Sequence, residues 1–199
     1  MDRGNIDQKP AYVEIVPDFY CDETGEPFVN CMECETDLIA SDEQYFIEKA
    51  RRRYPNTQET LTIFEFAICL SCATNLNQSL SKESLNKISE FQADLLRETY
   101  KSDSELHSNS GGVGNALNAC LFSGNEISKC EEYQLVGAFR GNKMILHDLP
   151  FAISGEIIEA MSEVLSDETK DEFDGFISKH FTGPPELQEL WGKPKLILI

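Results

Sequence analysis

The sequence contains no long apolar run. No stretch of its 199 residues approaches the roughly 18 apolar residues that a membrane-spanning helix requires. The first residues also lack the basic segment followed by an apolar run that is typical of a secretory signal. We therefore expect no membrane segment and a protein that stays in the cytoplasm.

Positive charge is scarce, because 17 Lys and Arg residues stand against 35 Asp and Glu residues, for a formal net charge of −18. Surfaces that bind nucleic acid normally carry a basic stripe facing the phosphates. The only basic run, 51–53, falls in a segment that also contains Asp42, Glu43 and Glu48, which is typical of a solvated helix face. The sequence predicts no nucleic-acid partner and favours basic or apolar protein surfaces as partners.

Catalytic motifs are also missing. His107, His147 and His180 have no adjacent pattern of a nucleophile and its base. The GGVG run at 111–114 lacks the Lys and the Ser or Thr of a phosphate-binding loop. We therefore expect a non-enzymatic protein, while an enzyme whose site is assembled from residues far apart in sequence is a further hypothesis.

What the sequence does have is seven cysteines, four of them in two C-x-x-C pairs: Cys31 and Cys34, then Cys69 and Cys72. Cytosolic thiols are kept reduced, so such pairs indicate metal binding or redox chemistry rather than a disulfide framework. Two intervening residues let both thiolates of a tight turn face one tetrahedral ion. The four cysteines are the predicted ligands of a closed structural site, and zinc is favoured over iron, which sulfur sites also accept.

The two pairs have different surroundings. NCMECETDL, around the first pair, is typical of a knuckle on a hairpin, whereas ICLSCATNL ends a strand and begins a helix. Residues 28–80 therefore resemble the treble-clef and zinc-ribbon group of zinc folds. The resemblance implies a structural metal at the four cysteines and implies no named activity.

Two alternatives to a metal site stay open. A C-x-x-C that follows a strand and opens a helix is also the local form of a thioredoxin-like motif, which Cys69 and Cys72 share. The alternative function is therefore a thiol redox or metal-responsive protein. The other alternative is that the cysteines are small buried apolar residues.

A possible internal repeat involves the remaining cysteines. Residues 21–31, CDETGEPFVNC, and 120–130, CLFSGNEISKC, share Cys, a hydroxyl residue, Gly and Cys at equal spacing. In this alignment Tyr133 stands where Cys34 would be, so the second copy lacks a ligand. Either Cys120 and Cys130 are buried thiols near a turn at Gly124, or they form a second site with Cys21, His107 or His147.

The composition predicts an α+β fold in two parts. Residues 101–118 are rich in Ser, Asn and Gly, which is typical of a flexible linker or loop. They separate a zinc-stabilised module with a long amphipathic helix, residues 1–100, from a smaller unit of a β-hairpin plus helices, residues 119–199.

Periodicity and capping residues give the expected elements. We predict strands at 12–16, 61–69 and 195–199, and a hairpin whose turn is Gly141–Asn142. We predict helices over 41–54, after Ser81, after Ser154, after Ser166 and through 187–191.

Overall fold

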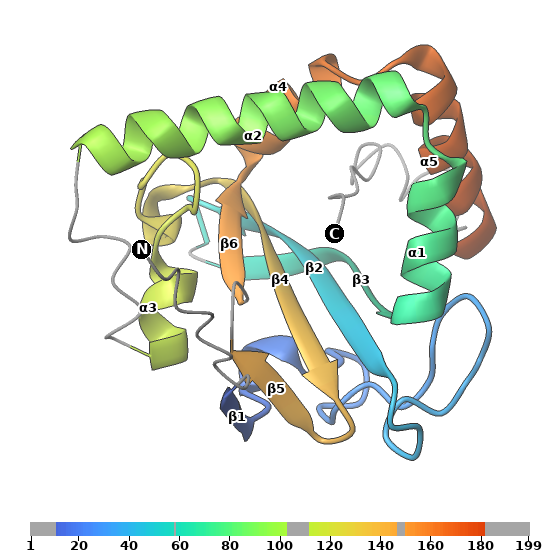
Figure 1. The fold of residues 1–199 in the computed structure, drawn as a ribbon. Helices are drawn as coiled ribbons and strands as arrows, with labels where there is room; N and C mark the ends of the chain where they lie inside the picture. Colours follow the sequence, from blue (N-terminus) through green and yellow to red (C-terminus); the bar gives the residue numbers. More distant parts are fainter. Residues whose placement is uncertain (1–10, 58, 103–111, 147–149, 182–199) are drawn as a thin grey trace, which may run out of the picture.

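One antiparallel sheet organises the chain. The structure, a computed structural model, describes residues 11–57, 59–102, 112–146 and 150–181. The strands are β1 (Ala11–Glu14), β2 (Gln44–Tyr54), β3 (Glu59–Cys69), β4 (Glu132–Arg140), β5 (Lys143–Leu146) and β6 (Phe151–Ser154). Their order is β1-β5-β4-β2-β3, and β6 pairs with β4 (Figure 1).

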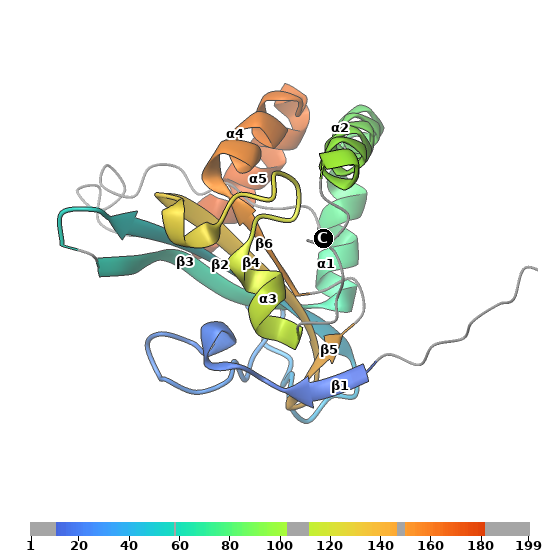
Figure 2. The same ribbon diagram turned by 90° about the vertical axis from the view of Figure 1, so that its left-hand side faces the viewer.

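The longer helices lie on one face of this sheet. The helices are α1 (Leu70–Ser79), α2 (Lys82–Ser102), α3 (Gly112–Asn118), α4 (Gly155–Glu163) and α5 (Asp167–His180), with short 3-10 turns η1 (Pro17–Phe19) and η3 (Ile127–Lys129). In Figure 2, α1, α2, α4 and α5 lie above the sheet and the N-terminal segment with η1 lies below it. The predicted α+β class is confirmed, with an antiparallel sheet.

The two central strands, β2 and β4, come from the two predicted parts of the chain, residues 1–100 and 119–199. β2 pairs with β4 from Gln44 opposite Arg140 to Arg52 opposite Glu132. β2 also pairs with β3 on its other side, so both of its edges are hydrogen-bonded to neighbouring strands. The two parts therefore contribute to one continuous sheet.

Aromatic side chains fill both faces. On the helix side, the rings of Phe66 and Phe176 lie 5.7 Å apart, which joins β3 to α5. On the opposite side, Phe139 lies 5.2 Å from Phe19 and 5.3 Å from Tyr45. Such ring pairs add to the apolar burial that stabilises the core.

The buried side chain of Lys49 links the sheet to the N-terminal segment. Lys49, in the middle of β2, is fully buried, and its Nζ donates to the Tyr20 carbonyl oxygen at 2.5 Å. The same Nζ lies 2.5 Å from Asp22 Oδ1 and 2.8 Å from Glu65 Oε2. Burial raises the pKa of Asp22, but hydrogen bonds from Lys49 and Thr62 outweigh it and leave the pKa below its usual value.

The predicted helix over 41–54 is wrong, because residues 44–54 form β2. Tyr45, Ile47, Ala50 and Tyr54 have helical spacing, but Phe46 between them is buried too. A strand covered on both faces has no polar side, so its spacing does not reveal its period. The run Arg51–Arg53 therefore lies on a strand: Arg51 and Asp22 are 3.5 Å apart, and Arg52 and Glu132 2.5 Å.

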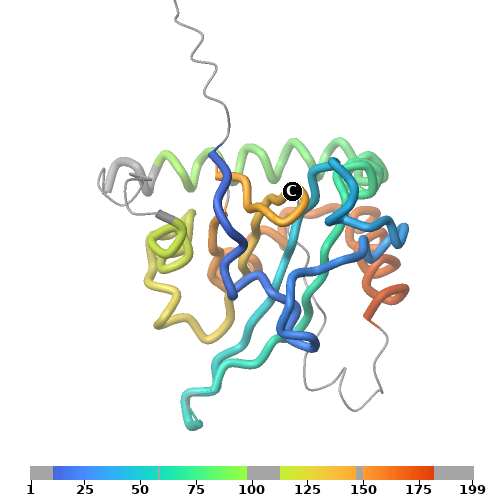
Figure 3. The backbone as a smooth tube through the Cα atoms, turned by 90° about the horizontal axis from the view of Figure 1, so that it is seen from below, coloured from blue at the N-terminus to red at the C-terminus, as the bar shows by residue number. Residues whose placement is uncertain are grey.

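Most other elements are confirmed. The strand at 61–69, the turn at Gly141–Asn142, and the helices after Ser81, Ser154 and Ser166 are all present. Of the predicted linker 101–118, residues 101–102 end α2 and 112–118 form α3; residues 103–111 lie outside the described residues, as do 187–191 and 195–199. Figure 3 shows the far ends of β2 and β3 projecting from the body of the protein.

Candidate metal centre

The first cysteine pair lies in a tight knuckle. The Cys31 N–H donates to the Thr36 carbonyl at 2.9 Å, and the Glu35 N–H donates to the Cys31 carbonyl at 2.8 Å. Glu35 has a φ of 60°, in the left-handed region, which closes the turn. This folding brings the side chains of Cys31 and Cys34 to the same end of the turn.

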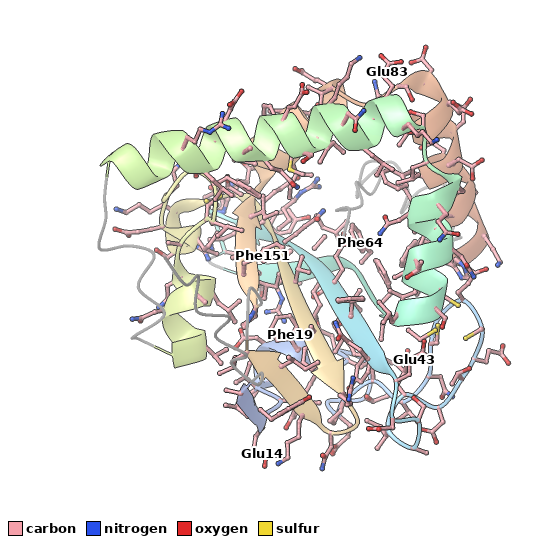
Figure 4. All side chains as sticks on the ribbon, viewed as in Figure 1. Glu14, Phe19, Glu43, Phe64, Glu83 and Phe151 are labelled. Atoms are coloured by element: carbon pink, nitrogen blue, oxygen red, sulfur yellow. The ribbon has the colours of Figure 1, made fainter. Side chains whose placement is uncertain are left out.

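The second pair lies where β3 becomes α1. Cys69 is the last residue of β3 and the N-cap of α1, and Cys72 lies in the first turn of the helix. Glu43, labelled in Figure 4 at the lower end of α1, accepts the Ser71 N–H at 2.9 Å and so satisfies a free donor of the first turn. The Met32 N–H donates to the Ala67 carbonyl at 2.8 Å, which fastens the knuckle to the end of β3.

These elements bring all four predicted ligands together. The sulfurs of Cys31, Cys34, Cys69 and Cys72 all lie within 4.8 Å of one another, and this group can hold a metal ion. Cys34 Sγ and Cys69 Sγ are 3.8 Å apart. Four ligands about 2.3 Å from a tetrahedral zinc lie about 3.8 Å from one another, whereas a disulfide joins sulfurs at about 2.05 Å. All seven cysteines are free thiols.

The thiols have different environments. Cys31 and Cys69 are buried, Cys72 is half-buried and Cys34 is exposed. Hydrogen bonding with the side chain and backbone of Thr36 lowers the pKa of Cys34 to about 6, which favours its thiolate form. Burial raises the pKa of Cys69 and of Cys72. A divalent cation would offset this cost, because it stabilises neighbouring thiolates.

Two side chains from α5 hold the knuckle from outside. Glu33, between the two cysteines of the first pair, has its Oε2 2.6 Å from His180 Nε2 and also pairs with Lys179. Hydrogen bonds from Lys179 outweigh the effect of burial and, together with His180, lower the pKa of Glu33. Sequence reasoning missed this contact because its partners are 147 positions apart. His107 and His147 lie outside the described residues.

The other cysteines do not join this cluster. Cys120 is buried beside the turn at Gly124, whose N–H donates to the Cys120 carbonyl at 2.9 Å, so the predicted burial and turn are confirmed for Cys120. Cys21 and Cys130 are only half-buried. Within the ranges that the structure describes, the four-cysteine cluster is the sole group of three or more metal-ligating side chains so placed.

Comparisons of the chain with protein-family models, with curated proteins and with solved structures find no match. Among the helices of the described residues, none is both long and apolar enough to cross a membrane. The interpretation of the site therefore depends on its own geometry.

Proposed function

We propose that the protein binds one zinc ion at Cys31, Cys34, Cys69 and Cys72, and that this zinc is structural, in a centre of treble-clef type. The mutual approach of the four sulfurs carries the proposal. The knuckle supplies two of the ligands, and the junction between β3 and α1 supplies the other two. Four protein sulfurs fill a tetrahedral shell, so no position is left for substrate or water, which is what distinguishes structural from catalytic zinc.

We further propose that the protein is non-enzymatic and works through contacts with other proteins. The net charge of −18 favours partners with basic surfaces. Three exposed apolar side chains lie close in sequence to the ligands: Val29 is 51% exposed, Leu70 41% and Ile39 37%. Apolar side chains of this kind would meet a complementary apolar surface on a partner.

Metal analysis of the full-length protein tests the zinc centre. We expect one zinc per chain after purification, and none in Cys34→Ser/Cys72→Ser. The matched control is Cys21→Ser/Cys130→Ser, which removes two half-buried thiols outside the cluster and should keep one zinc. A wild-type protein with no zinc, or one with iron in its place, would contradict the assignment.

A redox function is the second candidate, and the low pKa of Cys34 favours it, since a thiolate is the reactive form. In a thioredoxin-like pair, however, the cysteine with the depressed pKa opens the helix, and here the pKa of Cys69 is raised. Thiol titration separates the functions. Bound zinc should shield four thiols until a chelator is added, whereas a redox pair leaves one fast-reacting thiol in the purified protein.

The partner proposal is tested by replacing exposed apolar residues. We expect Val29→Ser/Leu70→Ser to keep one zinc and the wild-type melting temperature but to lose partners that the wild type retains by affinity purification. Tyr12→Ser provides a control, because Tyr12 is 47% exposed on β1. Equal partner recovery by wild type and the double variant would count against partner contacts at Val29 and Leu70.

A further inference from the structure

The turn at Cys120 has the same backbone hydrogen bonds as the knuckle at Cys31. The Cys120 N–H donates to the Asn125 carbonyl at 2.8 Å, and the Gly124 N–H donates back to Cys120 at 2.9 Å. Gly124 has a φ of 69°, as Glu35 has 60°. Isolated bridges close both turns, Asn30 with Asp37 and Ala119 with Glu126.

Each knuckle also attaches in the same way to the strand that leads into the first helix of its copy, β3 or β6. The Leu121 N–H donates to the Ala152 carbonyl at 2.8 Å, as Met32 does to Ala67. The Ser154 N–H lies 3.3 Å from Cys120 Sγ, as the Cys69 N–H lies 3.4 Å from Cys31 Sγ. β6 ends at Ser154 and α4 begins at the next residue, just as β3 ends at Cys69 and α1 follows.

The strands repeat the same pairing. From Tyr45 opposite Cys69, six successive pairs join β2 to β3 before the register shifts at Ala50. From Tyr133 opposite Ser154, four successive pairs join β4 to β6. In the second copy the return strand is divided into β6 and β5, whereas β3 is continuous.

The second helices of the two copies meet through reciprocal contacts. The Ser81 N–H donates to Thr169 Oγ1 at 3.2 Å, and the Ser166 N–H donates to Ser84 Oγ at 2.8 Å. The hydroxyl oxygens of Ser81 and Ser166 are themselves 2.9 Å apart. Ser84 and Thr169 are fully buried, so the N-terminal turn of each helix, α2 or α5, supplies a hydroxyl acceptor for a backbone N–H at the start of the other.

The central strand pair has the same symmetry. Tyr45 pairs with Phe139, and Tyr133 pairs with Arg51, which stands at the corresponding place in β2. Midway between these pairs, Glu48 lies opposite Val136, its own counterpart. A pseudo-twofold axis therefore passes between β2 and β4 and continues between Ser81 and Ser166 on the helix face.

We infer that the chain contains a second, metal-free copy of the metal centre, at Cys120, Ser123, Ser154 and Ile157, which correspond in order to Cys31, Cys34, Cys69 and Cys72. This inference rests on the proposal that the first centre binds a metal. In the second, hydrogen bonds to a single sulfur replace the ion. Cys120 Sγ accepts the Ser154 N–H, and the Ser154 hydroxyl oxygen lies 3.5 Å from it. Ile157, half-buried in the first turn of α4, has no ligand atom.

This equivalence shifts the repeat that the sequence predicts by ten residues. Cys120 corresponds to Cys31 rather than to Cys21, and Tyr133 corresponds to Tyr45 rather than to Cys34. The turn at Cys21 does share the local pattern, since Gly25 has a φ of 69° and its N–H donates to the Cys21 carbonyl. It is not followed by a strand and helix that place further ligands beside it.

Restoring the missing thiols tests the inference. We expect Ser123→Cys/Ser154→Cys/Ile157→Cys to bind two Co²⁺ ions per chain, against one for wild type, with a second increment of thiolate-to-cobalt and d–d absorption. The matched control is Ser123→Cys/Ser154→Cys/Glu156→Cys, which has as many cysteines but places the last on an exposed position. It should bind the second ion more weakly than the test variant. Equal second-ion affinity in the two variants, or no second ion in the test variant, overturns the inference.

The double variant Ser123→Cys/Ser154→Cys keeps Ile157 and its packing, so it covers the case in which the triple variant folds poorly. We expect it to bind a second Co²⁺ with three thiolates, more weakly than the triple variant. If neither variant folds with or without metal, the positions are not equivalent and the inference fails. A wild type that binds no metal would instead refute the proposed first centre. The number of additional Co²⁺ ions bound by the variant relative to wild type would still test the second site.

Discussion

The knuckles at Cys31 and Cys120 have nearly the same backbone but different chemistry. The first brings four thiols together, whereas the second surrounds one thiol with hydroxyl and amide donors. The helices that follow differ in a compensating way: Ile158 and Met161 are buried in α4, where α1 has Ala73 and the half-buried Leu76. The comparison indicates that larger apolar side chains stabilise the helix of the second copy, whereas the first turns of α1 bury smaller ones beside the cysteines.

The largest difference between the two knuckles should therefore appear when the metal is removed, as a difference in their local stability. Structural zinc contributes about 10–16 kcal/mol to folding, whereas a whole domain is stable by only about 5–15 kcal/mol. We expect a strong chelator to unfold residues 30–79, seen as loss of amide protection there by hydrogen exchange. Because the copies share a sheet, protection around 119–163 should decrease less. Equal retention of protection in both segments would show that the metal is not structural.

The next largest effect should come from Lys49, whose counterpart on β4 is Gly137, where the rings of Phe139 and Phe19 lie too close to leave room for a side chain. Removing one partner of a buried ion pair costs about 3–5 kcal/mol, since the remaining charges are left uncompensated. We expect Lys49→Met to lower the free energy of unfolding by this amount, measured with urea. The control Lys87→Met removes an exposed pair with Glu83 and should leave the free energy of unfolding close to that of the wild type. A similar change in both variants would contradict the role of Lys49.

A smaller effect is expected at the thiol of the second knuckle. Cys120→Ala removes the acceptor of the buried Ser154 N–H, and a buried donor left without its partner costs about 1–3 kcal/mol. Metal content should stay at one ion per chain, unlike in Cys31→Ala, which should bind none. Loss of metal from Cys120→Ala would mean that Cys120 belongs to the metal centre.

The smallest effect should come from the contact between the first knuckle and α5. Exposed ion pairs contribute about 0–1 kcal/mol, so we expect Glu33→Gln to lower the free energy of unfolding by less than about 1 kcal/mol at pH 7. The folded-state pKa of Glu33 is lowered, so its contribution is present above the ordinary value of 4.5 and is lost as pH falls through the folded value. Urea unfolding of both proteins at pH 7 and pH 4 measures this; an unchanged difference would contradict it.

The four-cysteine cluster was predictable because two C-x-x-C pairs carry their own geometry in their spacing. The helices after Ser81 and Ser166 were predictable too, since each begins with a hydroxyl residue and continues with an amphipathic stripe. Local patterns of this kind require no knowledge of the rest of the chain.

The central strand could not be identified in the same way. β2 is covered on both faces and contains the buried charges Glu48 and Lys49, whose burial depends on partners elsewhere in the fold. The repeat was aligned ten residues out of place because Cys21 and Cys31 begin similar turns. Only the strand and helix that follow each turn distinguish them, and those contacts are set by tertiary structure.

The reciprocal contact of Ser81 and Ser166 resembles the interface of a symmetric dimer, in which one surface patch meets its own copy. In a true homodimer every substitution occurs twice, so a lost ligand would empty both centres. Here both copies belong to one chain, and a change in one leaves the other intact. Joining the copies also makes their association intramolecular and independent of protein concentration. One half can therefore keep a demanding ligand set while the other is free to acquire a different surface.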